Sequence, residues 1–92
     1  MNGIDGDQIY RDVLRWIPPS AATVLEIGCG TGQLARSYKQ INPFVRYMGI
    51  EWSAKAAAIA EKTIETLLCG DVESMSLQEK ALEGKIDCLI YL

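Results

Sequence analysis

The chain has 92 residues, a length that predicts one domain or part of one. Hydrophobic residues make up 49% of the sequence and charged residues 23%, a globular composition that excludes intrinsic disorder. Nine basic and twelve acidic residues give a net charge of −3, and the basic residues are scattered along the chain. Because nucleic-acid binding needs a concentrated basic face, we expect no nucleic-acid partner.

Three cysteines, Cys29, Cys69 and Cys88, are widely spaced, and the chain contains no histidine. Without a C-x-x-C pair or a histidine, we expect no metal site and no thiol redox motif. Such cysteines are typical of small buried hydrophobes in a reducing compartment. The N-terminus is polar, unlike a signal peptide, and every apolar run is shorter than the roughly 18 residues of a membrane helix. The sequence therefore predicts a cytoplasmic protein with no membrane partner.

Helices and strands are predicted to alternate along the chain with short connections. Apolar residues at helical spacing predict a first helix over 9–17, which Pro18 and Pro19 end. The later segments, in chain order, are a strand at 23–27, a helix at 33–41, a strand at 44–50, a helix at 54–62 that Ser53 caps, a strand at 63–69, a short helix at 76–82 and a strand at 86–92. This alternation predicts an α/β fold with a parallel sheet.

The last apolar run reaches the final residue, Leu92, with no covering helix after it. An exposed apolar edge strand is an aggregation hazard, so the pattern favours the front portion of a longer α/β domain. A small domain with a terminal last strand has the same pattern. We therefore expect residues 1–92 to form a single, partial domain, with self-association through the C-terminal edge strand as one consequence.

A glycine-rich segment, Gly28-Cys29-Gly30-Thr31-Gly32, joins the first predicted strand to the following helix. Glycines allow unusual backbone angles and close approach of a ligand, and free N–H groups at a helix start attract a negative group. The segment is typical of a nucleotide-type cofactor site, and the alternative is a tight turn without ligand. Gln33 replaces the last glycine of the dinucleotide motif, and no Gly-Lys-Ser/Thr follows, which weakens the NAD and nucleoside triphosphate interpretations.

Residues 24–32, Val-Leu-Glu-Ile-Gly-Cys-Gly-Thr-Gly, resemble the first motif of class I S-adenosylmethionine-dependent methyltransferases. The resemblance extends from Thr23 to Leu92. It implies a Rossmann-like three-layer sandwich with a mainly parallel sheet in the order 3-2-1-4, truncated here after the fourth strand. It also implies S-adenosyl-L-methionine as cofactor, with the glycine segment around its methionine part.

Acidic residues at the ends of the predicted strands fit this resemblance. Glu26 matches the family's acidic residue that interacts, usually through water, with the cofactor's amino group; its alternative role is to cap the amides of its own loop. Glu51 ends the second strand, where a carboxylate can accept both hydroxyls of a ribose. Trp52 is placed against the adenine or packs as an ordinary tryptophan. Asp71 and Val72, after the third strand, match positions that contact the adenine, although Gly-Asp is also common in turns.

The predicted cofactor-binding residues are therefore Glu26, Gly28, Cys29, Gly30, Gly32, Glu51, Trp52, Asp71 and Val72. Cys29 is expected to contribute its backbone, because no base is present to activate its thiol. Tyr10 either packs against the fold or reaches the cofactor carboxylate, as a tyrosine does in some family members. No catalytic residue and no methyl acceptor can be assigned.

Three functions stay open on this sequence. The first is the cofactor-binding portion of a methyltransferase whose acceptor, a small molecule or another compound, is unidentified; the isolated chain is then expected to bind the cofactor weakly and to transfer no methyl group. The second is an α/β module that binds NAD or another adenosine nucleotide. The third is a truncated scaffold that associates through its edge strand.

Overall fold

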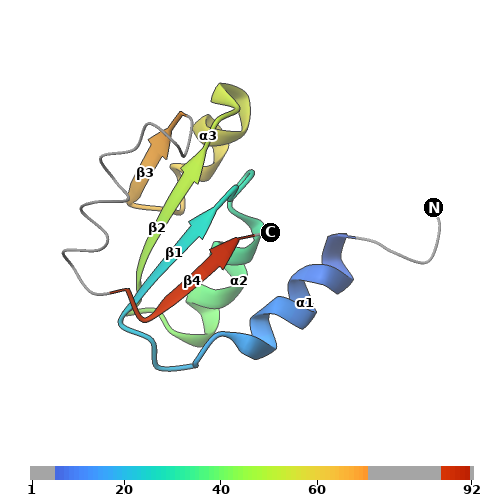
Figure 1. The fold of residues 1–92 in the computed structure, drawn as a ribbon, viewed down its shortest axis with the longest axis vertical. Coiled ribbons are helices and arrows are strands. Elements are labelled where there is room, and N and C mark those ends of the chain that lie inside the picture. The colour runs from blue at the N-terminus through green and yellow to red at the C-terminus, as the bar shows by residue number, and fades with distance from the viewer. Residues whose placement is uncertain (1–5, 71–85, 92) are drawn as a thin grey trace.

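The computed structural model describes residues 6–70 and 86–91, which form one parallel sheet and the helices that pack on it (Figure 1). The elements are α1 (Gly6–Trp16), β1 (Thr23–Ile27), α2 (Gln33–Ile41), β2 (Arg46–Glu51), α3 (Ala54–Ala60), β3 (Thr66–Cys69) and β4 (Cys88–Tyr91). The strand order is β3-β2-β1-β4, which confirms the predicted α/β fold and the order 3-2-1-4. No helix within the described ranges has the length and apolar character needed to cross a bilayer.

Strand β1 lies at the centre of the sheet and pairs in parallel with β2 on one side and β4 on the other. The register places Glu26 opposite Gly49 of β2 and Ile90 of β4. The four arrows in Figure 1 run in the same direction. The carboxyl ends of the strands therefore share one edge of the sheet, where open α/β sheets bind their ligands.

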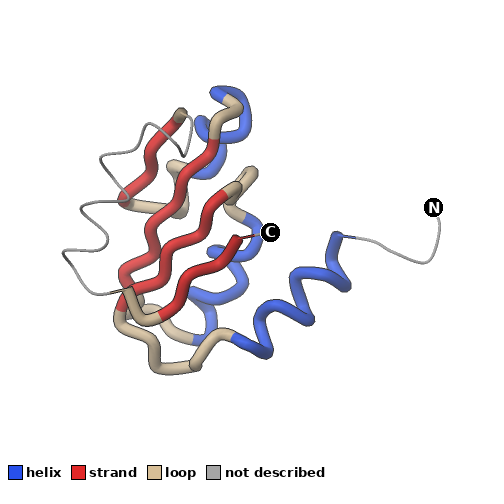
Figure 2. The backbone as a smooth tube through the Cα atoms, in the orientation of Figure 1, coloured by secondary structure: helices blue, strands red, loops and turns tan. Residues whose placement is uncertain are grey.

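Side chains alternate between the two faces of the sheet, as a strand period of two requires. The helix face carries the larger core, in which Val24 of β1 and Tyr47 of β2 pack with Leu34 and Tyr38 of α2. Figure 2 shows α2 behind the strands, and α1 and α3 contribute to the same core. The opposite face has its own apolar cluster of Leu25, Ile27, Met48 and Ile50. The helix predicted at 76–82 lies outside the described residues.

Several predicted boundaries differ from the structure. Strand β2 begins at Arg46, because Val45 N–H closes a turn on the Asn42 carbonyl and leaves Phe44 94% exposed. Strand β3 begins at Thr66, because the N–H groups of Thr63 and Ile64 bond to the Ala60 carbonyl at the end of α3. Accordingly, α3 ends at Ala60 and not at residue 62, α1 begins at Gly6, and β4 spans Cys88–Tyr91. The Ser53 cap is confirmed, since its Oγ accepts from Ala56 N–H at 3.3 Å.

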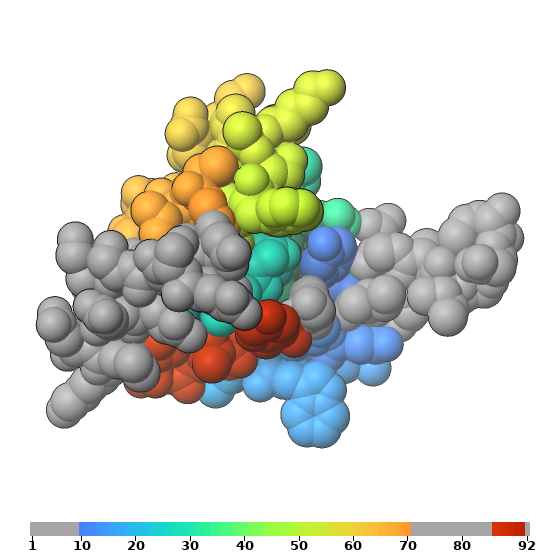
Figure 3. Space-filling view, turned by 45° about the horizontal axis from the view of Figure 1, so that its top comes forward, coloured from blue at the N-terminus to red at the C-terminus, as the bar shows by residue number. Residues whose placement is uncertain are grey.

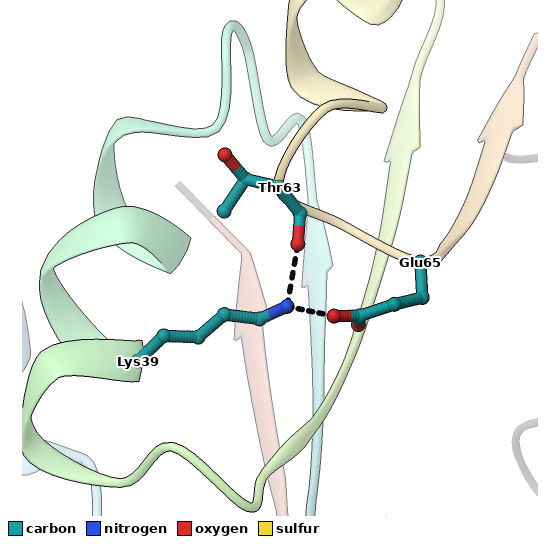
Figure 4. A network of polar contacts seen from close by, with 3 residues as sticks. All are labelled: Lys39, Thr63 and Glu65. Atoms are coloured by element: carbon teal, nitrogen blue, oxygen red, sulfur yellow. Dashed lines mark hydrogen bonds and ion pairs between the residues drawn. The ribbon is translucent and has the colours of Figure 1, made fainter.

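Lys39 of α2 holds the segment between α3 and β3 (Figure 4). Its Nζ donates to the Thr63 carbonyl and pairs with the Glu65 carboxylate. Partial burial raises the pKa of Glu65, but the hydrogen bond and charge of Lys39 outweigh burial and leave that pKa below its ordinary value. The contact ties the entry of β3 to the helix layer.

Candidate cofactor-binding site

The glycine loop, residues 28–32, leaves the end of β1 with three glycines in a left-handed conformation. The φ angles of Gly28, Gly30 and Gly32 are 79°, 58° and 87°. A Cβ at Gly28 or Gly30 would meet no other atom within 4 Å, whereas one at Gly32 would lie 3.4 Å from the Cα of Ala60. The first two glycines thus border open space, and the third allows close packing of the loop on α3.

Backbone N–H groups of the glycine loop are largely engaged inside the chain. Gly28 and Cys29 both donate to the Ile50 carbonyl, at 2.8 and 3.2 Å, and Gly32 donates to the Cys29 carbonyl at 3.0 Å. These loop amides are therefore bonded within the chain, whereas the sequence placed the free N–H groups at the start of the following helix. At the start of α2, Gly32 supplies no side-chain cap.

Glu51, at the end of β2, holds the glycine loop. Its Oε1 accepts from Gly30 N–H at 2.8 Å, and its Oε2 accepts from Ser53 N–H at 2.9 Å. The residue is buried, with 7% of its surface exposed. The alternative that Glu26 caps the loop amides is wrong, because Glu51 makes that contact. Since each carboxylate oxygen has two lone pairs, Glu51 keeps acceptor capacity for a ligand hydroxyl.

Glu26 is fully buried on the helix face of the sheet. Its Oε1 accepts a hydrogen bond of 2.7 Å from the Tyr47 hydroxyl, and its Oε2 has no hydrogen-bond partner among the described residues. Burial raises the pKa of Glu26 to about 7; the Tyr47 hydrogen bond opposes this rise and the Glu51 charge adds to it. A half-paired buried carboxylate is costly, and an arriving cation or donor would relieve that cost.

Tyr47 was not among the predicted site residues. It is fully buried, and burial, followed by the charge and hydrogen bond of Glu26, raises its pKa. The alternation along β2 places Tyr47, Gly49 and Glu51 on the same face as Glu26. That period-two spacing from Glu51 is the signal by which the sequence could have identified Tyr47.

Cys29 turns its side chain into the core. It is 1% exposed, and a Cβ on Gly49 would lie 2.9 Å from its Sγ. Burial and the charges of Glu26 and Glu51 raise the pKa of the Cys29 thiol to about 12. The thiol is therefore neutral at physiological pH and unsuited to nucleophilic attack. The expected contribution of the Cys29 backbone to the site stays a prediction.

Three predicted site residues remain: Trp52, Asp71 and Val72. Trp52 follows Glu51 and is 82% exposed, so its ring belongs to no packed core. Asp71 and Val72 lie outside the described residues; the segment before them meets β2 where Gly70 N–H donates to the Glu51 carbonyl at 3.0 Å. The end of β3 therefore lies beside the end of β2, as the prediction requires.

Tyr10 of α1 takes the packing role, the first of the two that the sequence left open, and its contact with a cofactor carboxylate stays a prediction. It packs against the core of the helix face, and its pKa is raised by burial and by the charges of Glu26, Cys29 and Glu51. The space-filling view shows the teal atoms of the β1 end and its loop between the blue atoms of α1, the yellow-green atoms of β2 and α3, and the orange end of β3 (Figure 3).

Comparison with known proteins agrees with this geometry. Residues 24–91 match the protein family described as "Methyltransferase domain". The chain belongs to the class I S-adenosylmethionine-dependent methyltransferases. Within this methyltransferase family it is 40% identical over 68 residues to the ribosomal RNA small subunit methyltransferase C of Actinobacillus succinogenes, a match that covers 73% of this chain and 20% of that protein.

Solved structures of other methyltransferases share the fold. The plantazolicin methyltransferase BpumL, solved in complex with SAH, superposes with a TM-score of 0.65 at 27% identity, over 77% of this chain and 27% of that chain. A TehB-like SAM-dependent methyltransferase from Corynebacterium glutamicum gives a TM-score of 0.69 at 17% identity, over 98% of this chain and 46% of that chain. The chain thus spans about a fifth of the curated relative and about a quarter of BpumL.

Proposed function

We propose that this chain is the cofactor-binding portion of an S-adenosylmethionine-dependent methyltransferase and forms one partial domain over residues 1–92. The observation that carries the proposal is Glu26, a fully buried carboxylate next to the glycine loop whose Oε2 has no partner among the described residues. A buried acid of this kind suits a ligand that brings a cation. S-adenosylmethionine carries an ammonium group as well as its sulfonium.

The residues of the site fit the parts of this cofactor one by one. Glu26 takes the ammonium group, and the open space beside Gly28 and Gly30 takes the methionine chain. The uncapped start of α2 takes the carboxylate, since helix N-termini favour anions. Glu51 takes the ribose hydroxyls, and Trp52, with its exposed ring, covers the adenine.

Asp71 and Val72 complete the proposed cofactor site at the adenine, after β3. Gly28, Cys29, Gly30 and Gly32 allow the close approach of the methionine chain to their backbone, whose N–H groups are bonded within the chain. The bound cofactor would supply an electrophilic methyl group, so the protein's contribution is to orient the ligand and exclude water. The chain's own part is then positional: Glu51 holds both the loop and the ribose, and Glu26 fixes the amino-acid end.

An NAD-binding module is the second candidate, and the same observations argue against it. A pyrophosphate needs N–H donors from the glycine loop, but those of Gly28, Cys29 and Gly30 are already bonded to Ile50 and Glu51. It would also meet the buried carboxyl group of Glu26. Both features favour a cationic ligand over a pyrophosphate.

Calorimetric titration of the chain with S-adenosylhomocysteine tests the proposal. We expect saturable binding that NAD does not displace. Glu51→Gln is expected to weaken binding, because an amide cannot accept at both of its ends from Gly30 N–H and Ser53 N–H while also holding a ribose. Glu65→Gln changes an exposed carboxylate that pairs with Lys39 and serves as the matched control.

Two results would contradict the proposal. One is displacement of S-adenosylhomocysteine by NAD at comparable concentrations. The other is equal affinity in the wild type, Glu51→Gln and Glu65→Gln. Absence of binding by a chain that circular dichroism shows to be folded would leave the scaffold function as the better account.

The proposal extends to the class of methyl acceptor. The relative from Actinobacillus succinogenes is named for ribosomal RNA, whereas BpumL is named for plantazolicin. The net charge of −3 leads us to propose a small-molecule or peptide acceptor and no nucleic acid for this chain. We also propose a cytoplasmic location, which suits three cysteines that are free of disulfides.

An association role through β4 has one observation in its favour. Leu89 and Tyr91 are 59% and 69% exposed on this strand, which pairs with β1 alone among the described strands. We propose that this edge mediates self-association if the cofactor function fails. Sedimentation of Leu89→Lys, compared with the wild type, distinguishes the cases, because a monomeric wild-type chain would exclude self-association.

A further inference from the structure

Glu26 and Tyr47 form a buried polar pair on the helix face of the sheet. Both residues are fully buried, and the hydroxyl of Tyr47 donates to Oε1 of Glu26 at 2.7 Å. The second oxygen, Oε2, has no partner among the described residues. The two oxygens of Glu26 therefore differ: Oε1 is bonded to the protein, and Oε2 is available to a ligand.

The ring of Tyr47 is held by packing. Its centroid lies 6.4 Å from that of Tyr38 with the rings tilted by 51°, and both rings belong to the core of the helix face. The Tyr38 hydroxyl donates to the Pro18 carbonyl. Tyr38 therefore does not compete for Glu26, and the two buried tyrosines have different polar partners.

We propose that Tyr47 is a positioning residue for the cofactor: its hydroxyl occupies Oε1 of Glu26 and leaves Oε2 to receive the ammonium group of the ligand. This inference rests on the proposed function and extends it to a residue that never touches the ligand. It also makes cofactor binding a proton-linked event, because the carboxyl group must be ionised to pair with a cation.

The groups around Glu26 contain no compensating cation among the described residues. Those that affect its ionisation or that of Tyr47 are Glu51 of β2, Cys29 of the loop and Cys88 of β4. The pKa of Tyr10 of α1 is affected by Glu26, Cys29 and Glu51. All of them are acids or neutral groups. Burial thus holds the pKa of Glu26 at about 7 in the free chain.

The ligand's ammonium group supplies the missing positive charge. It favours the carboxylate form, so binding at a pH below about 7 moves the proton of Glu26 to the solvent. Tyr47 acts in the same direction, because its hydrogen bond stabilises the carboxylate and lowers the pKa of Glu26. Without the hydroxyl, Glu26 would stay protonated at neutral pH and would meet the ligand uncharged.

The expected pH profile follows from this linkage. Below the pKa of Glu26, the affinity for S-adenosylhomocysteine falls about tenfold for each pH unit, and above it the affinity levels off. In Tyr47→Phe the affinity at pH 7 falls about tenfold or more, since a hydrogen bond to a charged group has that strength. This loss of affinity becomes smaller as the pH rises to 9, because at high pH Glu26 is ionised even without the hydrogen bond from Tyr47.

The experiment is calorimetric titration of the whole 92-residue chain with S-adenosylhomocysteine between pH 5.5 and 9. Tyr38→Phe is the matched control, since it removes a buried hydroxyl that bonds to a carbonyl and should leave the profile unchanged. Glu26→Gln should abolish the pH-dependent part. 5′-Methylthioadenosine, which lacks the amino-acid part, should bind with no dependence on Glu26. Repeating the titration at pH 6 in buffers of different ionisation enthalpy measures the released proton.

The outcomes separate this inference from the proposed function. Binding whose pH profile is the same in the wild type and Tyr47→Phe, or shifted equally by Tyr38→Phe, overturns the role of Tyr47 alone. No binding at any pH overturns both. If Tyr47→Phe does not fold, carbon-13 NMR of the wild-type Glu26 carboxyl decides, with Glu26→Gln for assignment. A pKa near 7 that falls on addition of ligand supports the inference, and an unchanged pKa overturns it.

Discussion

The side chain of Cys29 occupies the place that a side chain at residue 49 would fill. A Cβ on Gly49 would lie 2.9 Å from the Cys29 Sγ and 3.2 Å from Cδ1 of Ile64. The glycine of β2 and the buried thiol of the loop are therefore complementary in volume. This packing holds the middle of the glycine loop against the sheet, directly before the turn that presents Gly30.

Gly49→Ala is expected to destabilise the chain by about 1 to 3 kcal/mol, because the added Cβ overpacks the core and forces its neighbours to shift. Cys29→Ala removes the closest atom, so the same glycine substitution should cost less in that background. Rescue should be partial, since Cβ of Cys29 and Cδ1 of Ile64 stay at 3.3 and 3.2 Å. Urea unfolding of the four variants measures the coupling free energy. Equal costs of Gly49→Ala in both backgrounds would show that the two residues do not share this volume.

Glu51 links the glycine loop to β2 through a carboxylate that accepts from Gly30 N–H and Ser53 N–H. Glu51→Ala leaves both N–H groups without these acceptors, and a lost hydrogen bond to a charged group costs about 1.5 to 3 kcal/mol. We expect faster amide hydrogen exchange at Gly30 and Ser53, measured by NMR in the absence of ligand.

Exchange at Val24, inside β1, should change little in Glu51→Ala if the effect is local to the loop. Glu51→Asp is the matched variant, since it keeps the charge but shortens the side chain by one methylene. Unchanged exchange at Gly30 in Glu51→Ala would mean that the carboxylate does not hold the loop.

The local features of the site could be predicted from the sequence. The β-branched run before three glycines, followed by a helical pattern, placed β1 and α2 at their observed bounds. Glu51 was placed directly after the strand predicted at 44–50. Its partner was not predictable, because Gly30 lies 21 residues earlier and the contact depends on how β1 and β2 align.

The failures have a common physical cause, which is tertiary context. Phe44 has strong strand propensity, but the turn at Asn42 precedes β2 and leaves its ring exposed. Tyr47 was not predicted as a site residue, because its hydrogen bond to Glu26 depends on how β1 and β2 align. The predicted roles of Asp71 and Val72 remain predictions.

Lys39 should contribute to stability mainly through the Thr63 carbonyl and less through its ion pair. The side chain of Glu65 is 65% exposed, so solvent screens the pair, and Glu65→Gln should cost below about 1 kcal/mol. Lys39→Met removes both contacts and should cost more. The effect of Glu65→Gln should vanish in 0.5 M salt, whereas most of the effect of Lys39→Met should persist. Urea unfolding at two salt concentrations measures this difference, and equal costs of the two substitutions would contradict it.

Glu26 makes the stability of the ligand-free chain depend on pH in a direction opposite to that of most carboxylates. Its pKa is raised in the folded chain from 4.5 to about 7, chiefly by burial, so between these values the folded state holds a proton that the unfolded state has lost. Because the native state then binds more protons, stability falls as the pH rises from about 4.5 to 7 and stays level above that range.

Glu26→Gln removes this dependence. Relative to the wild type, the variant should gain about 2 to 3 kcal/mol of unfolding free energy between pH 5 and pH 8, since each pKa unit corresponds to about 1.36 kcal/mol. Urea unfolding at half-unit pH steps measures the difference between the two proteins, which cancels the titration of all other groups. Glu65→Gln is the control. Because the pKa of Glu65 is lowered in the folded chain, this carboxylate makes stability rise with pH, and it does so at lower pH than Glu26 acts. A constant difference between Glu26→Gln and the wild type from pH 5 to pH 8 would show that Glu26 is ionised throughout, and that the buried carboxylate is already stabilised without a ligand.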